Sequence, residues 1–396
     1  MNKTVRAGCQ CLLPTATLEL MKYYVIAGEA SGDLHASHLI ESLRKTDGNA
    51  QVRCFGGDLM EKAGATLVRH YRDLAYMGIW PVLTHLGTIL KGATQCFSDI
   101  AEWKPDAVIL VDYPGFNLKI ASKVHSELGI PVYYYISPKI WAWKSYRIKN
   151  IRRDVSALFS ILPFEVDYFA RHDYAINYVG NPTVDEVCQY RRETVGAAPA
   201  IAHDGRRVVA LLAGSRRHEI TRNLPYMVEA LKGIEGIRPV LACAPGIAPS
   251  FYDTLECCRG LEKVYGNTYG LLNCSYAALV TSGTATLETA LFGVPQVVCY
   301  RMPARHIVSL FRGKFLKVKY ISLVNLVTDC NTVPELVGAD MTARKVREHL
   351  LPLLSESETR RKQLEGYERM RELLGPEGAP QKAAGLMADM LRKGRK

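Results

Sequence analysis

Short apolar runs alternate with amphipathic segments along this chain from Lys22 onward. Uninterrupted apolar runs between turn residues are typical of buried strands, whereas apolar residues spaced three and four apart indicate helices, here expected over 34–45, 84–102 and 116–128. This alternation predicts parallel sheets that are covered by helices on both faces. The strands expected in the first half are Tyr23–Ala27, Gln51–Phe55, Ala107–Val111, Val132–Ile136, Ala157–Ile161 and Ile176–Val179.

Residues 194–206 interrupt the pattern, because Ala, Gly and Pro follow one another there without periodicity. The alternation then resumes, and a chain of 396 residues is long enough for two domains with separate cores. We therefore expect an α/β protein in which two Rossmann-like, doubly wound parallel-sheet domains face each other across a cleft. The strands expected in the second half are Val208–Leu212, Pro239–Ala242, Lys263–Tyr265, Ala277–Val280 and Gln296–Val298.

The expected domain boundaries follow from these interruptions. A disordered extension over residues 1–20 precedes a first domain over 21–193, and a second domain covers 207–365. The remainder, 366–396, is expected to be a C-terminal helix that packs back on the first domain or is exchanged in a dimer. A Gly-Pro pair at 375–376 breaks the helical pattern there.

The charge balance favours anionic partners. Fifty Lys and Arg against 39 Asp and Glu give a net charge of +11, and the excess is concentrated in residues 128–153 and 301–328, which hold six cations each and no carboxylate. Phosphorylated substrates, lipid headgroups and nucleic acid would all suit such patches. No RRM, KH or zinc-finger pattern is present, so nucleic acid is not expected as a partner.

The sequence also argues against several cofactor classes. The 11 cysteines are scattered and form no CxxC pair, which predicts reduced thiols in a cytoplasmic protein and no metal site. Neither a GxGxxG nor a Walker A motif occurs, which argues against NAD enzymes and P-loop NTPases. We expect no cofactor and no transmembrane helix.

The most informative motif is a turn of small and hydroxyl-bearing residues between the expected strand Ala277–Val280 and a helix. The free N–H groups of such a turn and the positive end of the helix dipole attract phosphate. Glu288 lies one helical turn later, where its carboxylate could accept hydrogen bonds from sugar hydroxyls. The pair of features predicts a nucleotide-sugar site. The turn consists of Ser282, Gly283, Thr284 and Ala285.

Two turns of the first domain are candidates for the opposite side of the cleft. Asp112 follows the most apolar strand and could act as a general base if its surroundings raise its pKa. An aspartate before a helix can equally be an N-cap. The turn after the first strand can contact a ligand or can be a tight connection only. Its candidate residues are Gly28, Glu29, Ser31 and Gly32.

Further candidates also follow strands. Arg216, beside a Gly-Ser turn, could stabilise diphosphate with its fixed fork of donors, or could be a surface residue. Trp141 and Trp143, beside cations, could line a sugar or acyl pocket or could pack the loop. Asn325 stands in an apolar run and either reaches the cleft or is a buried amide that is satisfied internally.

Two segments suit contact with an anionic lipid surface. Residues 77–90 are apolar with few charges, and aromatic and basic residues are interleaved over 311–319. A core helix and a solvated face are the alternatives for these segments. The side chains expected to contact the membrane are Ile79, Trp80, Leu83, Leu86, Arg312, Phe315 and Lys317.

Taken together, the motifs resemble those of lipid-A-disaccharide synthases, bacterial glycosyltransferases of the two-domain GT-B type. They run in order from about residue 22 to 330, and the Ser-Pro-x-x-Trp-Ala-Trp element is the most specific of them. Ala213 and Val324 stand where the family more often has Pro. The shared motifs are Gly28-Glu29-Ala30-Ser31-Gly32-Asp33, Met77-Gly78-Ile79, Asp112-x-Pro114-x-Phe116-Asn117, Ser137-Pro138-x-x-Trp141-Ala142-Trp143, Leu162-Pro163-Phe164-Glu165, Gly214-Ser215-Arg216-x-x-Glu219, Ser282-Gly283-Thr284-Ala285-x-Leu287-Glu288, Tyr300-Arg301 and Ser322-Leu323-x-Asn325-Leu326.

The resemblance implies an inverting transfer of a diacylglucosamine unit. The donor would be UDP-2,3-diacylglucosamine and the acceptor 2,3-diacylglucosamine 1-phosphate (lipid X), giving a β-1,6-linked disaccharide 1-phosphate and UDP. Asp112 would be the base, and no metal would be needed. The residues implied for UDP-sugar binding are Arg216, Ser282, Gly283, Thr284, Ala285, Glu288, Arg301 and Asn325.

The resemblance also implies a place in the cell. The protein would be cytoplasmic and peripheral on the inner face of the inner membrane, in contact with anionic membrane lipids. A homodimer is compatible with it, and the sequence leaves open whether such a dimer exchanges its C-terminal helices.

Two other functions stay open from the residues alone. A soluble GT-B enzyme, such as a UDP-GlcNAc 2-epimerase, would not need an acylated substrate. A catalytically silent protein that binds UDP-sugar or membrane would show affinity for UDP without turnover.

Overall fold

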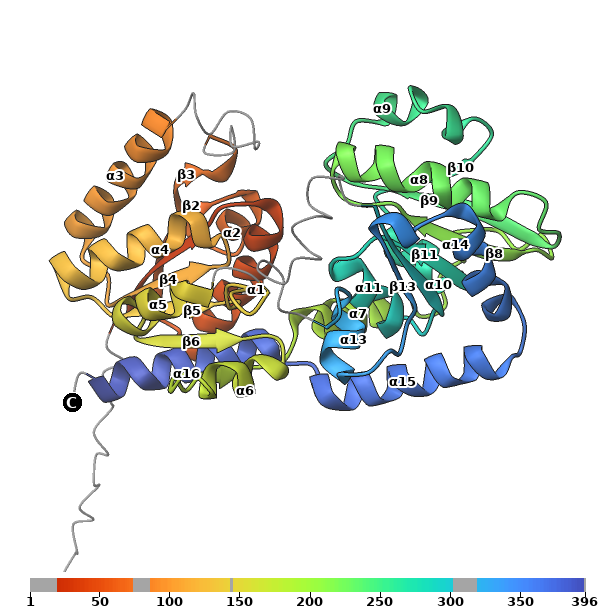
Figure 1. The fold of residues 1–396 in the computed structure, drawn as a ribbon. Helices are drawn as coiled ribbons and strands as arrows, with labels where there is room; N and C mark the ends of the chain where they lie inside the picture. The colour runs from red at the N-terminus through yellow and green to blue at the C-terminus, as the bar shows by residue number, and fades with distance from the viewer. Residues whose placement is uncertain (1–19, 74–85, 143–144, 302–318, 395–396) are drawn as a thin grey trace, which may run out of the picture.

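A computed structural model describes residues 20–73, 86–142, 145–301 and 319–394, which form two α/β halves that lie side by side (Figure 1). Each half contains a wholly parallel sheet, so the expected α/β class with two doubly wound sheets is confirmed. The first sheet has the order β3-β2-β1-β4-β5-β6-β7, with strands β1 Lys22–Ala27, β2 Gln51–Gly56, β3 Thr66–His70, β4 Ala107–Val111, β5 Val132–Tyr135, β6 Ala157–Ser160 and β7 Asn177–Tyr178. The second has the order β10-β9-β8-β11-β12-β13, with strands β8 Arg207–Leu212, β9 Ile237–Cys243, β10 Glu262–Tyr265, β11 Ala277–Val280, β12 Gln296–Tyr300 and β13 Glu335–Val337.

Alternate residues of each strand face opposite layers of helices. In β1, Tyr23 and Val25 pack with α1 and α16 on one face of the sheet, whereas Tyr24 and Ile26 pack with α3, α4, α5 and α6 on the other. Because both faces are covered, the strands are apolar along most of their length. The helices of the first half are α1 Ala30–Thr46, α2 Asp58–Lys62, α3 Leu86–Trp103, α4 Pro114–Lys123, α5 Ile148–Asp154 and α6 Phe164–Ala170.

The second sheet is built on the same plan. In β8, Val209 and Leu211 pack with α8 and α14, whereas Ala210 and Leu212 face the layer that contains α10. The helices of the second half are α8 Arg217–Leu231, α9 Pro249–Asp253, α10 Thr268–Asn273, α11 Thr284–Leu291, α13 Leu323–Thr328, α14 Ala343–Leu350 and α15 Glu358–Leu374.

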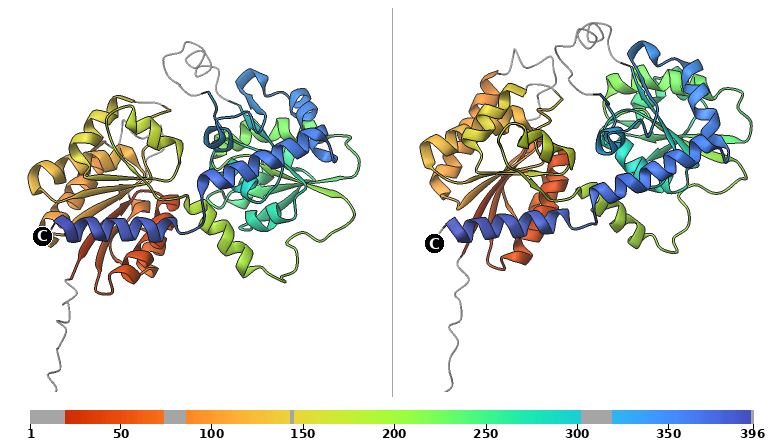
Figure 2. Two further views of the ribbon diagram at one scale, coloured as in Figure 1. Left: turned by 90° about the horizontal axis from the view of Figure 1, so that it is seen from below. Right: turned by 60° about the horizontal axis from the view of Figure 1, so that its bottom comes forward.

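Two helices join the halves. Helix α7 (Pro182–Glu193) follows the first sheet, yet its residues Val184 and Val187 share a buried cluster with Leu287 and Leu291 of α11. At the other end, α15 packs on the second half and α16 (Ala379–Gly394) returns to lie beside α1 (Figure 2). The expected boundary at 365/366 therefore falls inside α15, and the chain crosses between the halves at the Gly-Pro break that follows it.

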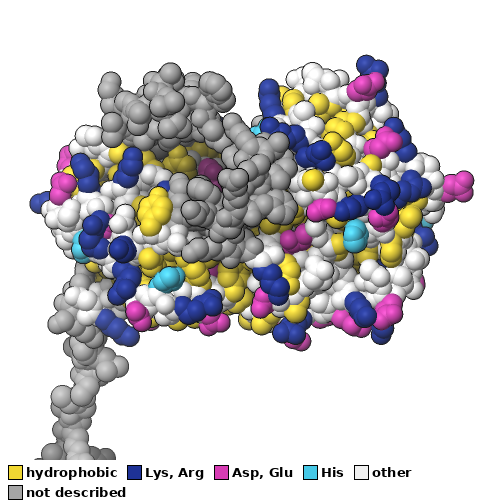
Figure 3. Space-filling model, viewed as in Figure 1, with side chains coloured by type: hydrophobic (Ala, Val, Ile, Leu, Met, Phe, Trp, Pro, Cys, Tyr) yellow, Lys and Arg dark blue, Asp and Glu magenta, His cyan; other side chains and the backbone are white. Residues whose placement is uncertain are grey.

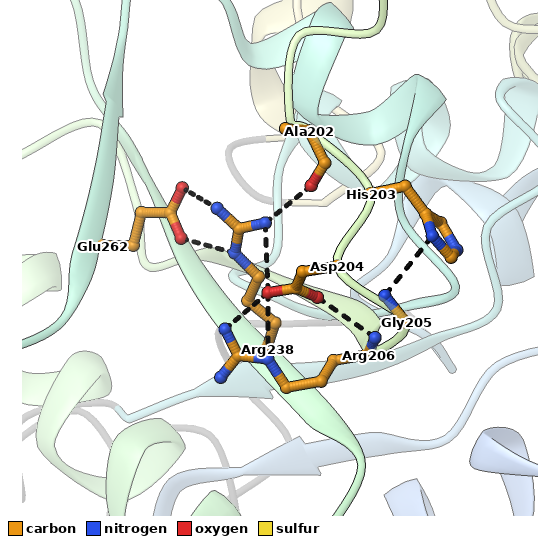
Figure 4. A network of polar contacts seen from close by, with 7 residues as sticks. All are labelled: Ala202, His203, Asp204, Gly205, Arg206, Arg238 and Glu262. Atoms are coloured by element: carbon orange, nitrogen blue, oxygen red, sulfur yellow. Dashed lines mark hydrogen bonds and ion pairs between the residues drawn. The ribbon is translucent and has the colours of Figure 1, made fainter.

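Polar contacts tie the linker between the halves to the second sheet (Figure 4). Arg238 of β9 donates to both carboxylate oxygens of Glu262 at 2.7 and 2.8 Å, and to the carbonyl of Ala202 at 2.7 Å. Asp204 in turn accepts from the backbone and guanidinium of Arg206. The linker is therefore held against the starts of β9 and β10.

Two short strands were not predicted, and each lies at an edge of a sheet. β3 (Thr66–His70) carries Arg and His among its apolar residues, and β13 has three residues, so neither has the apolar run of a central strand. The helix expected over 116–128 ends its α-helical part at Lys123 and continues as a five-residue π-helical turn. In the described ranges, no helix is both long and apolar enough to cross a bilayer.

Candidate active site

The candidate motifs of each half stand beside one another because of the strand order. In the first sheet the order reverses between β1 and β4, and Ala27 at the end of β1 is paired with Val111 at the end of β4. In the second sheet the same relation holds for Leu212 of β8 and Val280 of β11. Ligands of doubly wound sheets bind at these switch points. Each half thus presents two adjacent turns there.

Asp112 follows β4 on a strained stretch of backbone. Asp112 and Tyr113 both have φ +45°, a left-handed conformation that non-glycine residues rarely adopt and that gathers at functional sites. The carbonyl of Asp112 accepts hydrogen bonds from the amide of Asn117 at 2.7 Å and from the hydroxyl of Tyr134 at 2.5 Å. Both donors are buried. The turn that carries the carboxyl group is therefore fixed by the interior of the domain.

Burial raises the pKa of the Asp112 carboxyl group above its usual value. The positive charge of Lys139 opposes this shift, and the negative charge of Glu29 adds to it. A carboxylate whose proton affinity is raised while it stays partly accessible meets the requirement for a general base.

The turn after β1 fits closely against the turn after β4. A Cβ atom on Gly28 would lie 2.2 Å from Cδ1 of the Tyr113 ring, so only glycine leaves room for that ring. Glu29 and Ser31 are exposed at the start of α1 and hydrogen-bond to each other at 2.9 Å. Gly32 is buried under Ala27, so it has a packing role and offers no side chain to the cleft.

Helix α11 opens at the expected anion turn. Its N-cap, Gly283, provides no side-chain hydrogen bond to the helix, and Gly283 and Thr284 are exposed. The first N–H groups of a helix have no partner within the helix, so this turn offers donors and the positive dipole end to solvent. Ala285 is half-buried in the first turn. The Ser282 hydroxyl donates to the carbonyl of Ile321 at 2.8 Å and so holds the turn to the start of α13.

Glu288 belongs to a chain of polar side chains that crosses the molecule. Oε1 of Glu288 lies 3.4 Å from the hydroxyl of Tyr269, which also lies 3.2 Å from Oε2 of Glu186 on α7. Oε1 of Glu186 is 3.3 Å from Nδ1 of His35 on α1. Burial and the nearby charge of Glu186 raise the pKa of Glu288 to about 7. A polar relay thus links the first helix to the nucleotide-sugar candidate.

The two arginines differ in how they are held. The side chain of Arg216 is 65% exposed, and its guanidinium contacts Glu219 at 3.0 Å. Glu219 also accepts hydrogen bonds from the backbone N–H groups of Ser215 and Arg216. The carboxylate of Glu219 therefore occupies the start of α8. Arg301 is more enclosed, because it donates to the carbonyl of Met341 at 2.8 Å and covers the ring of Tyr226.

The structure corrects the expectation that Asn325 reaches the cleft. Asn325 is fully buried, and its amide group bonds both the N–H and the carbonyl of Val333 at 2.9 Å. It also donates to Glu335, which accepts from the backbone of Ile321 and Ser322 as well. The buried-amide alternative therefore describes Asn325: it shapes the loop that supports Ser282 and does not face a ligand.

Trp141 is half-buried in the segment that follows β5. Its indole N–H donates to the buried Glu165 at 2.8 Å, and its ring meets that of Phe164 edge to face at 5.0 Å. Burial raises the pKa of Glu165 to about 7. The indole face is thereby fixed in position. Trp143 lies outside the described residues.

The expected membrane contacts cannot be placed. The described ranges leave out Ile79, Trp80, Leu83, Arg312, Phe315 and Lys317. Leu86 begins α3, and its side chain is not described.

Three polar residues that hold the candidate site together were not identified from the sequence. Asn223, fully buried on α8, donates to the Thr281 hydroxyl at 3.0 Å and accepts from the backbone of Arg301 at 2.9 Å, so it joins the ends of β11 and β12. Tyr269 and Glu335 are the others. None of them follows a strand, and no local spacing distinguishes them from ordinary helix or edge-strand residues.

Comparison with known proteins gives matches over nearly the whole chain. The family described as lipid-A-disaccharide synthetase matches residues 23–387. A lipid-A-disaccharide synthase of Myxococcus xanthus is 37% identical over 379 residues, which cover 94% of this chain and 98% of that protein.

Among solved structures, the glycotransferase of kitacinnamycin has a TM-score of 0.61 at 15% identity, covering 94% of this chain and 99% of that one. The UDP-GlcNAc 2-epimerase of Methanocaldococcus jannaschii, in complex with UDP-GlcNAc and UDP, has a TM-score of 0.59 at 15% identity, covering 95% and 100%. At such low identity these structures show a shared fold only.

Proposed function

Since the chain belongs to the lipid-A-disaccharide synthase family and is a glycosyltransferase of lipid A biosynthesis, we propose how its two halves divide the reaction. The second half binds UDP-2,3-diacylglucosamine, and the first half presents lipid X and the base. The observation that carries this proposal is the pairing of strand ends. It puts Asp112 at the switch point of one sheet and the open start of α11 at that of the other.

The donor site consists of the α11 turn and the side chains around it. The N–H groups and dipole of α11 stabilise the diphosphate, and Arg216 adds an exposed guanidinium. Glu219 occupies the start of α8, so the phosphates are directed to α11. Glu288, one turn into α11, accepts from the ribose hydroxyls. The guanidinium of Arg301 already contacts the carbonyl of Met341 and the ring of Tyr226. Arg301 therefore supports the structure around the site.

Asp112 acts on the acceptor. The 6-hydroxyl of lipid X loses its proton to the Asp112 carboxylate as its oxygen attacks the anomeric carbon of the donor. The bond from that carbon to the UDP oxygen breaks, and UDP leaves with the electron pair. UDP is a stable anion when its charge is stabilised, so it needs donors and no general acid. The acceptor oxygen attacks the face of the anomeric carbon opposite to UDP, so the configuration is inverted. One base is sufficient for this single displacement.

The place of the enzyme at the inner face of the inner membrane follows from its substrates. Both carry acyl chains that are held in the bilayer. The surfaces that we propose for anionic lipids are the segments around Trp80 and Phe315.

One assay tests the proposal directly. Purified protein is mixed with UDP-2,3-diacylglucosamine and lipid X in the presence of a chelator, and UDP release is followed. We expect release that requires both lipids and yields one disaccharide 1-phosphate per UDP. UDP release that does not depend on lipid X, or tight UDP binding with no release at all, would contradict it. Conversion of UDP-GlcNAc to its 2-epimer would favour the epimerase alternative.

A further inference from the structure

A large groove lies between the halves. Its volume is about 1310 Å³, above the range of roughly 300–1,000 Å³ that is usual for small-molecule sites. One wall comes from the first half, with Trp141 and α6, and the other from α13 and α15 of the second half. On this face of the molecule, hydrophobic side chains are exposed on both halves (Figure 3).

The walls of the groove are largely apolar. Trp141, Phe164 and Tyr168 supply aromatic rings from the first half, and Leu326 and Leu373 supply aliphatic side chains from the second. Leu373 is 40% exposed, one of only a few large hydrophobic residues that are exposed in the described part of the chain. Apolar side chains of both halves therefore face the groove, as is usual in sites that bind a largely apolar group.

Two residues that line the groove are linked to the two parts of the proposed reaction centre. From the first half, Trp141 donates to Glu165 at 2.8 Å, and Glu165 is close enough to Asp112 for the negative charge of Asp112 to raise its pKa. From the second half, Tyr320 precedes Ile321, whose carbonyl accepts from the Ser282 hydroxyl at 2.8 Å. The groove is thus connected to the turn of the base and to the donor turn.

The exposed charges at the rim of the groove are positive on balance, with three cations against two carboxylates. Arg171, Lys319 and Arg369 are exposed there, against the carboxylates of Asp167 and Asp329. Lys319 lies 3.9 Å from Asp329, and both side chains are highly exposed, so solvent weakens this pair. Cations above apolar walls suit an amphiphile that carries an anionic group.

We propose that this groove binds an acyl chain of the acceptor lipid, with the acceptor phosphate at the cationic rim. The inference rests on the proposed function and adds the location of the acceptor chain. The acceptor fits better than the donor for two reasons. The aromatic wall comes from the half that carries Asp112, and the phosphates of the donor are already assigned to α11.

Leu373→Asp tests the groove, with Leu351→Asp as the matched control. Both leucines are exposed, at 40% and 45%, and Leu351 does not line the groove. The Kd for lipid X in detergent micelles is measured directly, together with the KM values for acceptor and donor. We expect Leu373→Asp to raise the Kd and the acceptor KM about tenfold, because a charge would face the chain. The donor KM, the Kd for UDP and the melting temperature should match those of Leu351→Asp.

The outcomes separate the groove from the reaction. If the two variants bind lipid X equally, the groove proposal is wrong even when the wild-type enzyme turns over. A rise in the donor KM with no change in lipid X binding would overturn the choice of the acceptor. Wild-type protein that does not release UDP, but binds lipid X in a way that only Leu373→Asp weakens, would reject the proposed function and keep the groove.

Discussion

The hydroxyl of Tyr269 lies 3.4 Å from a carboxylate oxygen of Glu288. The same hydroxyl lies 3.2 Å from Glu186, and because it carries one proton, it donates to one carboxylate at a time. Burial raises the pKa of Glu288 to about 7, so its proton affinity is much higher than that of an ordinary glutamate. The hydrogen bond from Tyr269 therefore orients Glu288 and opposes the rise of its pKa.

Replacing Tyr269 by Phe should weaken donor binding more than catalysis. The change leaves two neighbouring carboxylates without the hydroxyl between them, and a hydrogen bond to a charged group is worth about 1.5–3 kcal/mol. We expect the donor KM to rise about tenfold and kcat to change little, as measured by UDP release. Tyr174→Phe is the control, because its hydroxyl donates to Val155 at 3.1 Å within the first half. Equal KM values for the two variants would refute this role of Tyr269.

Asp112→Asn should cut kcat by a factor on the order of 10² or more, as is usual when a general base is lost. The Kd for UDP should stay unchanged, because the donor turn lies in the other half. Asp106→Asn is the matched control, since Asp106 precedes the same strand that Asp112 follows and accepts from the backbone of Lys22 at 2.7 Å. Turnover that survives in Asp112→Asn would remove this residue from the mechanism.

The close fit of Gly28 against Tyr113 makes a separate prediction. A methyl group on Gly28 would displace the Tyr113 ring and with it the neighbouring Asp112, so Gly28→Ala should lower kcat about tenfold or more. Gly115→Ala, in the first turn of α4, places its Cβ in open space and should leave kcat at the wild-type level. Circular dichroism verifies that both variants fold. Full activity in Gly28→Ala would show that the turn tolerates the shift.

The central strands were predictable because they are buried on both faces. Ala107–Val111 and Ala277–Val280 have the bounds expected from their apolar runs, and the turns that follow them carry the motifs. In a doubly wound sheet the ends of such strands mark the ligand site, so a local pattern was enough to locate it. The edge strand Thr66–His70 has no comparable run, since its burial is partial.

The contacts within the site could not be predicted in this way. Asn325 and Asp112 both look like polar residues beside apolar ones in the sequence. The structure buries Asn325 against Val333 and Glu335 and leaves Asp112 partly accessible. Asn325 is buried because Val333 and Glu335 satisfy its amide group. Glu335 begins β13, a strand of three residues that is too short to predict from its sequence. Likewise, the contact of Tyr269 with Glu186 joins residues 83 positions apart.

Glu165 offers a test of the electrostatics that is independent of substrate. It is 1% exposed, accepts from the Trp141 indole at 2.8 Å, and contacts the Ser160 hydroxyl. Burial is the largest cause of its raised pKa, and its hydrogen bonds and the charge of Lys139 oppose the shift. A folded-state pKa of about 7 against an ordinary value of 4.5 means that folding favours the protonated form between these two values.

The free energy of unfolding should therefore fall as the pH rises, and Glu165→Gln should remove this dependence. The contribution of Glu165 is fully present below about pH 4.5 and is lost as the pH passes 7. Glutamine keeps the shape and an acceptor for Trp141 but does not titrate. Relative to wild type, we expect the variant to gain on the order of 1–3 kcal/mol between pH 5 and 8, since one pKa unit corresponds to about 1.4 kcal/mol. Urea unfolding followed by tryptophan fluorescence at both pH values measures the difference. If the midpoints of the two proteins moved in parallel, the Glu165 carboxyl group would be ionised in the folded protein at both pH values, and burial would not control it.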